Sequence, residues 1–344
     1  MSAAIDVRRD FDGGPGFLNT ASVGIPPRRA AEALAEATAE WARGRVQPPS
    51  YDDPVARSRA AFARLHGVEP GDVAIGPQVS YFVGLVASAL PPGAEVIGYE
   101  GDFTSLLFPF LARDDLRVRL VPLDAVADAV SETTALVAIS AVQSADGAVA
   151  DLDAIESAAA RHGARTLIDT TQSSGWLPLA AGRFDYVVAG AYKWLLSPRG
   201  SAFMALRPER RDELTPTAAG WYAGALPWES IYGAPLRLAR DARRFDMSPA
   251  WLVWVGTAVA LEYIEGVGIE AIHAHDVALA NEARERLGLP PGESAIFAVA
   301  GDAAPDALAA GGVTAAVRAG QVRVSFHLYN SRDDVDALVR ALGR

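Results

Sequence analysis

The sequence contains no cysteine. This absence excludes disulfide bonds, zinc–thiolate sites, iron–sulfur clusters and a thiol nucleophile. Any chemistry that the chain performs must therefore be thiol-free, and no persulfide can be carried on a side chain of this protein.

Positive charge is also scarce. The 344 residues include 31 basic and 42 acidic side chains, which gives a net charge of −11. Such a chain is poorly suited to neutralising phosphates, so we expect no binding to nucleic acid. At about 150 residues per domain, the length corresponds to roughly two domains with a large buried core.

Long apolar runs are missing as well. The longest, at residues 250–261, is too short to span a bilayer, ends at Glu262, and predicts a buried helix. Residues 1–16 mix Asp, Arg, Gly and Pro and lack the apolar region of a signal peptide. We therefore expect a cytoplasmic location and no membrane span.

Lysine is almost absent. Of the 31 basic residues, 30 are arginine and one, Lys193, is lysine. Codon usage accounts for a bias of this kind, but the exception needs a reason. Arginine replaces lysine at most surface positions, whereas a guanidinium stays protonated and cannot form an imine. The single lysine is therefore expected to have a chemical role.

The middle of the chain alternates between short β-branched segments and Ala-rich helical patterns. Helices are predicted at residues 80–90, 105–113 and 152–162. Strands are predicted at residues 73–75, 95–99, 117–121, 135–140, 166–169, 186–189 and 202–206. This alternation is typical of an α/β fold, a three-layer sandwich with a mostly parallel sheet.

The C-terminal part shows a different pattern. A long helical region precedes strands predicted at residues 295–299, 314–317 and 322–326, and a closing helix begins near Arg332. These elements predict a smaller α+β domain. We place the large domain at residues 17–235 and the small one at 236–344, with residues 1–47 forming an arm and helix that pack with the small domain.

Two polar side chains are predicted to lie at the carboxyl ends of neighbouring strands, where ligands collect in open α/β sheets. Asp169 ends one strand, and Lys193 follows the next strand, 24 residues later. Pyridoxal 5'-phosphate requires this pair, because the lysine forms a Schiff base with its aldehyde and the carboxylate keeps the pyridine nitrogen protonated. Gln172 is placed to donate to the phenolic oxygen of the same ring. In the alternative without a cofactor, Asp169 only caps a helix and Lys193 forms an ion pair on the surface.

Four motifs carry a resemblance to a known family. They are FLNTAS at 17–22, LIDTTQ at 167–172, GAYKWL at 190–195 and RVSFHLYN at 323–330. Together they resemble the class V aminotransferase superfamily of fold-type I pyridoxal phosphate enzymes, which includes cysteine desulfurases, selenocysteine lyases, kynureninases and isopenicillin N epimerases. The likeness covers nearly the whole chain, but this fold hosts many reactions.

The resemblance implies several cofactor contacts. Val79 and Ser80 match the phosphate-binding pair at the start of a helix, where backbone N–H groups favour an anion. Phe103 matches the aromatic residue that stacks on the cofactor ring. Ser248 matches a residue that reaches the phosphate of a neighbouring subunit, which implies a homodimer. Without the resemblance, Ser80 is an ordinary helix N-cap and Phe103 a core residue.

Substrate contacts are implied in the same way. Arg323 matches the arginine that binds a substrate carboxylate, for which a planar bidentate donor is well suited. Asn19 and Ala21 match a loop that lines the substrate pocket. Outside the resemblance, Arg323 would be one of many surface arginines and Asn19 a turn residue.

Three departures distinguish this chain from a typical desulfurase. Gly190 replaces a serine that helps to hold phosphate, so another group must compensate. Tyr192 replaces a histidine, directly before the lysine, that is used in proton transfer. Ser144 replaces an asparagine near the cofactor and the substrate carboxylate. The missing cysteine separates the chain further, because desulfurases accept sulfur on a catalytic cysteine.

The predicted function is that of a pyridoxal phosphate enzyme in which an amino acid replaces Lys193 on the cofactor and the freed lysine removes the Cα proton. We favour a carbon–sulfur lyase that acts by β-elimination on an S-substituted cysteine. An aminotransferase or epimerase is the alternative, and an inactive binding or scaffold protein is the alternative of another class. No metal site is expected, since His273 and His275 are two residues apart and do not share a helix face.

Overall fold

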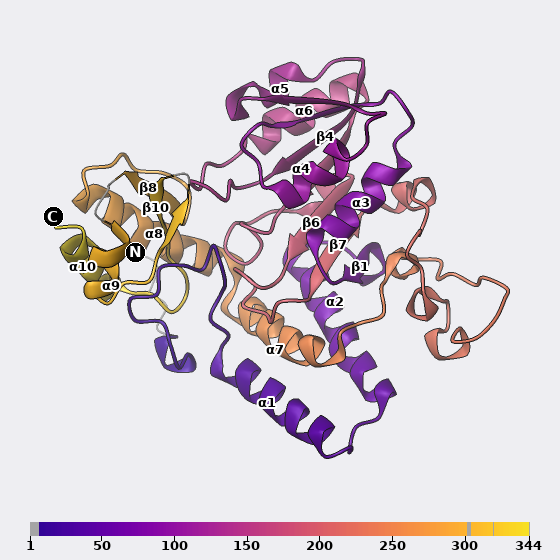
Figure 1. Ribbon diagram of the computed structural model, residues 1–344, viewed down its shortest axis with the longest axis horizontal. Helices are drawn as coiled ribbons and strands as arrows, with labels where there is room; N and C mark the ends of the chain where they lie inside the picture. Colours follow the sequence, from indigo (N-terminus) through magenta and orange to yellow (C-terminus); the bar gives the residue numbers. More distant parts are fainter. Residues whose placement is uncertain (1–6, 301–303, 319, 344) are drawn as a thin grey trace.

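A computed structural model describes residues 7–300, 304–318 and 320–343. Its main feature is a mixed sheet of seven strands in the order β1-β7-β6-β5-β4-β2-β3 (Figure 1). The strands are β1 (Val73–Gly76), β2 (Glu95–Tyr99), β3 (Arg117–Val121), β4 (Thr134–Ser140), β5 (Arg165–Asp169), β6 (Tyr186–Gly190) and β7 (Ala202–Leu206). All seven predicted strands are confirmed, with ends within one residue of the prediction.

The sheet is mostly parallel, as predicted. Strands β3, β2, β4, β5 and β6 run in the same direction, whereas β7 pairs antiparallel with both β6 and β1. The carboxyl ends of β4, β5 and β6 therefore meet at one edge of the sheet. This arrangement brings Ser140, Asp169 and Gly190, the last residues of the three strands, to the same side.

The three layers follow from alternation along the strands. In β6, Tyr186 and Val188 face one apolar cluster, and Val187 and Ala189 face the other. Helices α3 (Val79–Ala89) and α4 (Thr104–Leu111) bury side chains in the first cluster. The second cluster contains side chains from α2 (Asp52–His66), α5 (Val126–Ala129) and α6 (Leu152–His162). The predicted three-layer sandwich is confirmed.

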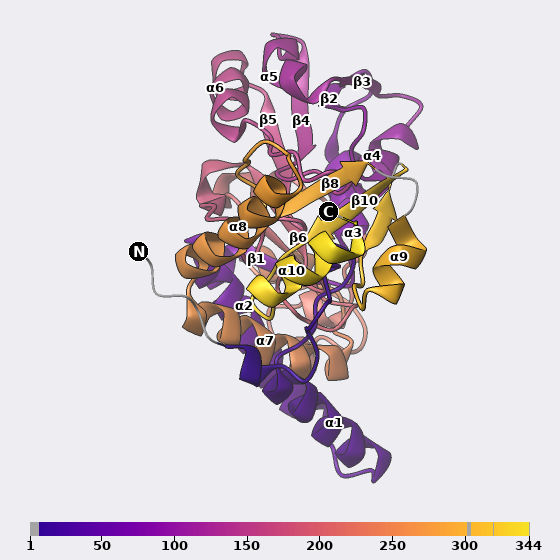
Figure 2. The same cartoon turned by 90° about the vertical axis from the view of Figure 1, so that its left-hand side faces the viewer.

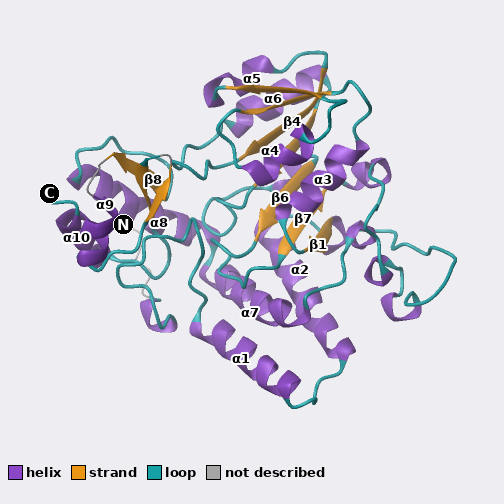
Figure 3. Ribbon diagram, viewed as in Figure 1, coloured by secondary structure: helices purple, strands orange, loops and turns teal. Residues whose placement is uncertain are grey.

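The C-terminal part forms a smaller antiparallel sheet in the order β8-β10-β9, which lies to the left of the large sheet in Figure 1 and in front of it in Figure 2. Its strands are β8 (Ile296–Ala300), β9 (Ala316–Arg318) and β10 (Gln321–Ser325). Helices α8 (Ile269–Arg286), α9 (Ala304–Ala310) and α10 (Arg332–Ala341) accompany it, and their apolar side chains share one core with those of the strands. The predicted α+β region is thus present. Figure 3 shows its strands and helices as a group separate from the large sheet.

The N-terminal segment connects both parts of the molecule. Residues 16–18 pair with the small sheet, since Leu18 N donates to Thr314 O and Ser325 N donates to Leu18 O. Helix α1 (Arg28–Ala42) then packs on α7 (Trp251–Val267), which also packs on α2. The proposed boundary at residue 235 assigns α7 to the small domain, although α7 lies with α1 and α2 (Figure 1). The division into domains remains a prediction.

Within the described residues, no single helix has both the length and the apolar composition needed to cross a membrane. In the described part of the chain, α7 and α8 meet those two criteria as a pair, and their axes are bent by 81° at the break between them. Eight residues of α7, from Trp254 to Ile264, are buried in the protein core, as the apolar run predicts.

Candidate active site

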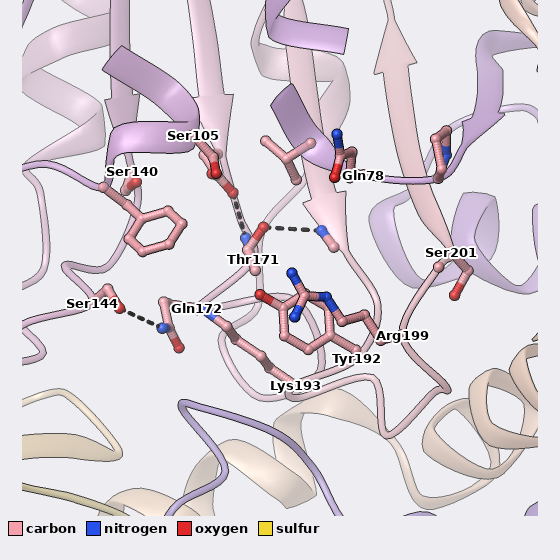
Figure 4. Close-up of a pocket in the computed structure, with 16 residues that line it drawn as sticks. Gln78, Ser105, Ser140, Ser144, Thr171, Gln172, Tyr192, Lys193, Arg199 and Ser201 are labelled. Atoms are coloured by element: carbon pink, nitrogen blue, oxygen red, sulfur yellow. Dashed lines mark hydrogen bonds between the residues drawn. The ribbon is translucent and has the colours of Figure 1, made fainter. Parts of the chain in front are cut away.

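A cavity of about 320 Å³ lies at the carboxyl ends of β4, β5 and β6. This volume is within the usual range for small-molecule sites. The predicted residues that line it are Val79, Phe103, Ser144, Asp169, Gln172, Tyr192 and Lys193 (Figure 4). Side chains more than 100 residues apart in the sequence therefore converge on one cavity.

The other predicted site residues lie outside this lining. Ser80 is half-buried in the first turn of α3, next to Val79. Ala21 and Arg323 contact lining residues through hydrogen bonds. Asn19 pairs with Ser325 of β10, and its buried Oδ1 has no partner among the described residues. Ser248 is exposed, at the end of the segment that precedes α7.

Lys193 is buried, with 5% of its surface exposed. Burial lowers the pKa of its amine to about 8, and the nearby charge of Asp169 opposes part of this shift. The Nζ atom lies 5.4 Å from the ring centre of Phe103 and 5.6 Å from that of Tyr192. At pH 7 roughly a tenth of this amine is uncharged, far more than for an ordinary lysine, and the uncharged amine is the form that acts as a nucleophile or a base.

Asp169 is also buried at the end of β5. Its Oδ1 accepts a hydrogen bond from Thr171 N at 2.8 Å. Burial raises the pKa of its carboxyl group to about 6, and the neighbouring buried Asp102 contributes in the same direction. A cationic N–H group beside this carboxylate would stabilise its charged form, so the site favours a ligand with a protonated ring nitrogen.

Two glycines and a histidine surround the loop that carries Lys193. A Cβ atom on Gly24 would lie 2.0 Å from Lys193 O, and one on Gly175 would lie 2.3 Å from Trp194 O. His327 Nε2 contacts Trp194 O at 3.0 Å, while its Nδ1 contacts Asp276 Oδ2 at 2.7 Å. Segments from three regions of the chain therefore fix the backbone next to the lysine.

The turn after Lys193 contains a strained residue. Leu196 has φ of 54° and is the one non-glycine residue with positive φ in the described chain. A branched side chain in the left-handed region is held there only by its surroundings, and such residues gather at functional sites. Leu196 is fully buried, and its N–H donates to Lys193 O.

The amide of Gln172 is fixed by three hydrogen bonds. Its Oε1 accepts from Trp194 Nε1 at 2.9 Å, and its Nε2 donates to Ala21 O and to Ser144 Oγ at 3.0 and 2.9 Å. Both N–H bonds of the amide are thus in use. To donate to a phenolic oxygen, as the sequence predicts, Gln172 must give up one of its two donated hydrogen bonds, to Ala21 or to Ser144.

Arg323 is a buried cation without a carboxylate partner among the described residues. Its Nη1 donates to Ser144 O and Oγ, and its Nη2 donates to Ser22 Oγ at 2.6 Å. Its Nε is buried and has no partner in the part of the chain that the structure describes. Burial, with Arg318 nearby, lowers the pKa of the guanidinium to about 10. A buried charge is costly unless it is paired, so the free Nε favours an anionic ligand.

Residues 112–301 match the family model described as aminotransferase class-V. This match covers more than half of the chain. The chain belongs to the class V aminotransferase family. The family resemblance in the sequence motifs is thereby confirmed, and the chain is a pyridoxal 5'-phosphate-dependent enzyme.

Two curated relatives of this chain are named for different activities. The chain is 28% identical to an uncharacterized aminotransferase, YcbU, of Bacillus subtilis strain 168, over 81% of this chain and 80% of that protein. It is also 28% identical to the isopenicillin N epimerase of Streptomyces clavuligerus, over 80% of this chain and 76% of the epimerase.

Two solved structures share the fold. A cystine C-S lyase, C-DES, in complex with its product cysteine persulfide, has a TM-score of 0.86 at 21% identity, over 95% of this chain and 97% of that one. The apo cysteine desulfurase of Thermococcus onnurineus NA1 has a TM-score of 0.83 at 19% identity, over 99% and 97% of the two chains. At these identities the likeness shows the fold alone.

The cavity of this class V enzyme fits pyridoxal phosphate. The buried carboxylate of Asp169 suits the ring nitrogen, the buried amine of Lys193 suits the aldehyde, and Phe103 lies beside the amine with 45% of its surface exposed. At the other end, Pro77, Gln78 and Val79 bring the N-terminus of α3 to the cavity wall, where backbone N–H groups attract an anion.

The sequence prediction missed several lining residues. Among them are Gln78, Ser105, Thr171 and Arg199. Thr171 Oγ1 accepts from Gly190 N at 2.9 Å, so a threonine next to Asp169 anchors the end of β6. The position of Thr171 within the LIDTTQ motif was a usable signal, whereas the sequence around Arg199 contains no indication of its orientation.

Proposed function

We propose that this enzyme is a carbon–sulfur lyase that acts on an S-substituted cysteine by β-elimination. The observation that carries the proposal is the cavity in which the single lysine, a buried amine with a lowered pKa, lies near the buried guanidinium of Arg323 with its free Nε. The chain has no cysteine on which sulfur could be transferred, so a thiol that simply leaves suits it better than persulfide formation on the enzyme.

The cofactor, when bound, supplies an electron sink for the pair of electrons left at Cα after proton loss. Arg323 binds the substrate carboxylate, which sets the orientation of the Cα–H bond. Lys193 accepts the Cα proton at its uncharged Nζ. Asp169 keeps the proton on the ring nitrogen of the cofactor, because its buried carboxylate gains a cationic partner there.

The overall reaction balances with one water molecule. The Cα–H and Cβ–S bonds of the substrate break, and the thiol leaves with the proton that Lys193 accepted from Cα. The remaining three-carbon unit is hydrolysed to pyruvate and ammonium. No oxidant, reductant or acceptor side chain is consumed, which agrees with the residues that line the cavity.

The alternative reactions share the first step. Cα deprotonation by Lys193 also begins transamination and epimerisation, and the relatives at 28% identity bear the names of an aminotransferase and an epimerase. The same residues would serve all three reactions. The proposal therefore depends on product analysis rather than on the first step.

Incubation with a panel of S-substituted cysteines, scored for pyruvate, ammonium and free thiol, tests the proposal. We expect equal amounts of the three products without added keto acid. Turnover that requires a keto acid would replace the lyase by an aminotransferase, and exchange of the Cα hydrogen with inversion but no pyruvate would replace it by an epimerase.

We also propose that the enzyme is a homodimer in the cytoplasm, with Ser248 reaching the phosphate of the other subunit. Ser248 is exposed in the isolated chain, and the segment before it carries the exposed apolar side chains of Leu226, Ile231, Tyr232 and Leu236. Burial of such side chains stabilises association. Sedimentation should give the mass of two chains.

A further inference from the structure

Three charged side chains line the cavity in the described structure, and two of them already have a role. Lys193 and Asp169 suit the aldehyde and the ring nitrogen of the cofactor, whereas Arg199 has no function in the mechanism. The phosphate of the cofactor brings about two negative charges into the same space. Arg199 is therefore the remaining cation that lines the cavity.

The position of Arg199 suits that charge. Its guanidinium carbon lies 5.3 Å from the ring centre of Tyr192. Figure 4 shows Arg199 and Gln78 on one side of the cavity, while Ser144 and Gln172 lie on the other. The side that carries Arg199 therefore also carries the N-terminus of α3, which begins directly after Gln78.

The nearby end of β6 offers the phosphate no side chain. Gly190 lines the cavity, and its N–H donates to Thr171 Oγ1. A Cβ atom at Gly190 would lie 3.3 Å from Tyr192 Cε1 and 3.4 Å from Thr171 Cγ2, so the space next to it is already filled. An anion at this end must be held by groups other than residue 190.

Arg199 is free to bind an anion. No ion pair or hydrogen bond involves its side chain within the described residues, and the side chain is exposed in the isolated chain. A guanidinium stacked on an aromatic face keeps its N–H edges available, and two of them match the oxygens of a phosphate. The stacking on Tyr192 also limits the orientations of the side chain before the anion arrives.

We propose that Arg199 binds the phosphate group of the cofactor, together with the backbone N–H groups at the N-terminus of α3. The inference rests on the proposed cofactor site, but not on the choice between lyase, aminotransferase and epimerase. Tyr192 is the positioning residue that holds the guanidinium toward the cavity.

Binding of two cofactor forms by the apoprotein tests this proposal. Pyridoxal 5'-phosphate and pyridoxal, which lacks the phosphate, are titrated separately, and each dissociation constant is measured by visible absorbance. In Arg199→Gln we expect the constant for pyridoxal 5'-phosphate to rise about 10- to 100-fold, as for loss of a hydrogen bond to a charged group. The constant for pyridoxal should change less than about twofold.

Controls make the outcome specific. Arg161→Gln removes another exposed arginine, on α6, and should leave both constants unchanged. Arg199→Lys retains the charge without the planar fork and should fall between wild type and Arg199→Gln. If Arg199→Gln raises the two dissociation constants equally, or changes neither, Arg199 does not bind the phosphate. If wild type binds neither form, the proposed cofactor site itself is wrong.

Discussion

The hydroxyl of Ser144 accepts a hydrogen bond from Arg323 Nη1 at 3.1 Å. The same Oγ also accepts from Gln172 Nε2, so one serine connects the predicted cofactor side of the cavity with the predicted substrate side. A hydroxyl oxygen has two acceptor positions, and both are used here. A ligand that takes either donor away from Ser144 therefore frees an acceptor position on this shared hydroxyl.

Arg323→Gln is expected to weaken amino-acid binding. Loss of the charged, bidentate donor should raise KM about 10- to 100-fold, with a smaller change in kcat. Arg318→Gln is the matched control, since Arg318 also contacts Ser22 Oγ, at 3.4 Å, but is exposed. Kinetics of both variants on one substrate check this prediction. If both variants change KM equally, Arg323 does not bind the substrate carboxylate.

The rate at which Lys193 reacts with pyridoxal 5'-phosphate should depend on pH. The pKa of about 8 lies below the ordinary value of 10.5, so the uncharged amine falls about tenfold for each pH unit below 8 and levels off above it. Stopped-flow absorbance of the apoprotein from pH 6 to 10 measures the profile. A rate that keeps rising up to pH 10 would contradict a buried, perturbed amine.

Gly24→Ala should displace the Lys193 loop. The added methyl group would lie 2.0 Å from Lys193 O, which is backbone and cannot rotate away. We expect a loss of about 1–3 kcal/mol in stability and slower reaction of Lys193 with the cofactor. Gly266→Ala is the control, because a Cβ at that position has open space within α7. Urea unfolding measures the stability of both variants, and visible absorbance measures how fast Lys193 reacts with the cofactor in each. If the two variants do not differ, the N-terminal segment around Gly24 does not constrain the Lys193 loop.

His327→Gln should destabilise the protein strongly. Both ring nitrogens face acceptors, namely Asp276 Oδ2 and the carbonyl oxygen of Trp194, and all three residues are buried. Removing one partner leaves buried polar groups without their hydrogen bonds, which costs about 1–3 kcal/mol for each group. The exposed pair of Arg332 and Glu282 is the control, and Arg332→Gln should cost less than about 1 kcal/mol. Similar losses in the two variants would show that the buried contacts of His327 contribute no more to stability than an exposed ion pair.

The sheet was predictable because its strands are short, apolar runs between helical segments. The seven strands from Val73 to Leu206 were located within a residue at each end. The direction of β7 was not predictable, since an antiparallel strand buried on both sides has the same composition as its parallel neighbours. The close approach of Gly24 to Lys193 was likewise invisible, because it joins residues 169 positions apart.

The site was predictable only where a residue type carries chemistry. Lys193 stood out by its rarity and Asp169 by its position at a strand end, and the fold brings both to one cavity. Arg199 could not be singled out among 30 arginines, since its role depends on where the loop after Pro198 points. The roles of Ser80 and Ser248 remain predictions, because neither residue lines the cavity of the described chain.

Reduction of the reconstituted protein shows whether Lys193 carries the cofactor. The protein is loaded with pyridoxal 5'-phosphate, its visible absorbance is recorded, borohydride is added, and the adduct is located by peptide mass. We predict an absorption band that disappears on reduction and an adduct on the peptide containing Lys193, absent in Lys193→Arg. An adduct confined to the N-terminal amine, or no adduct at all, would show that Lys193 does not carry the cofactor and would favour a binding or scaffold protein.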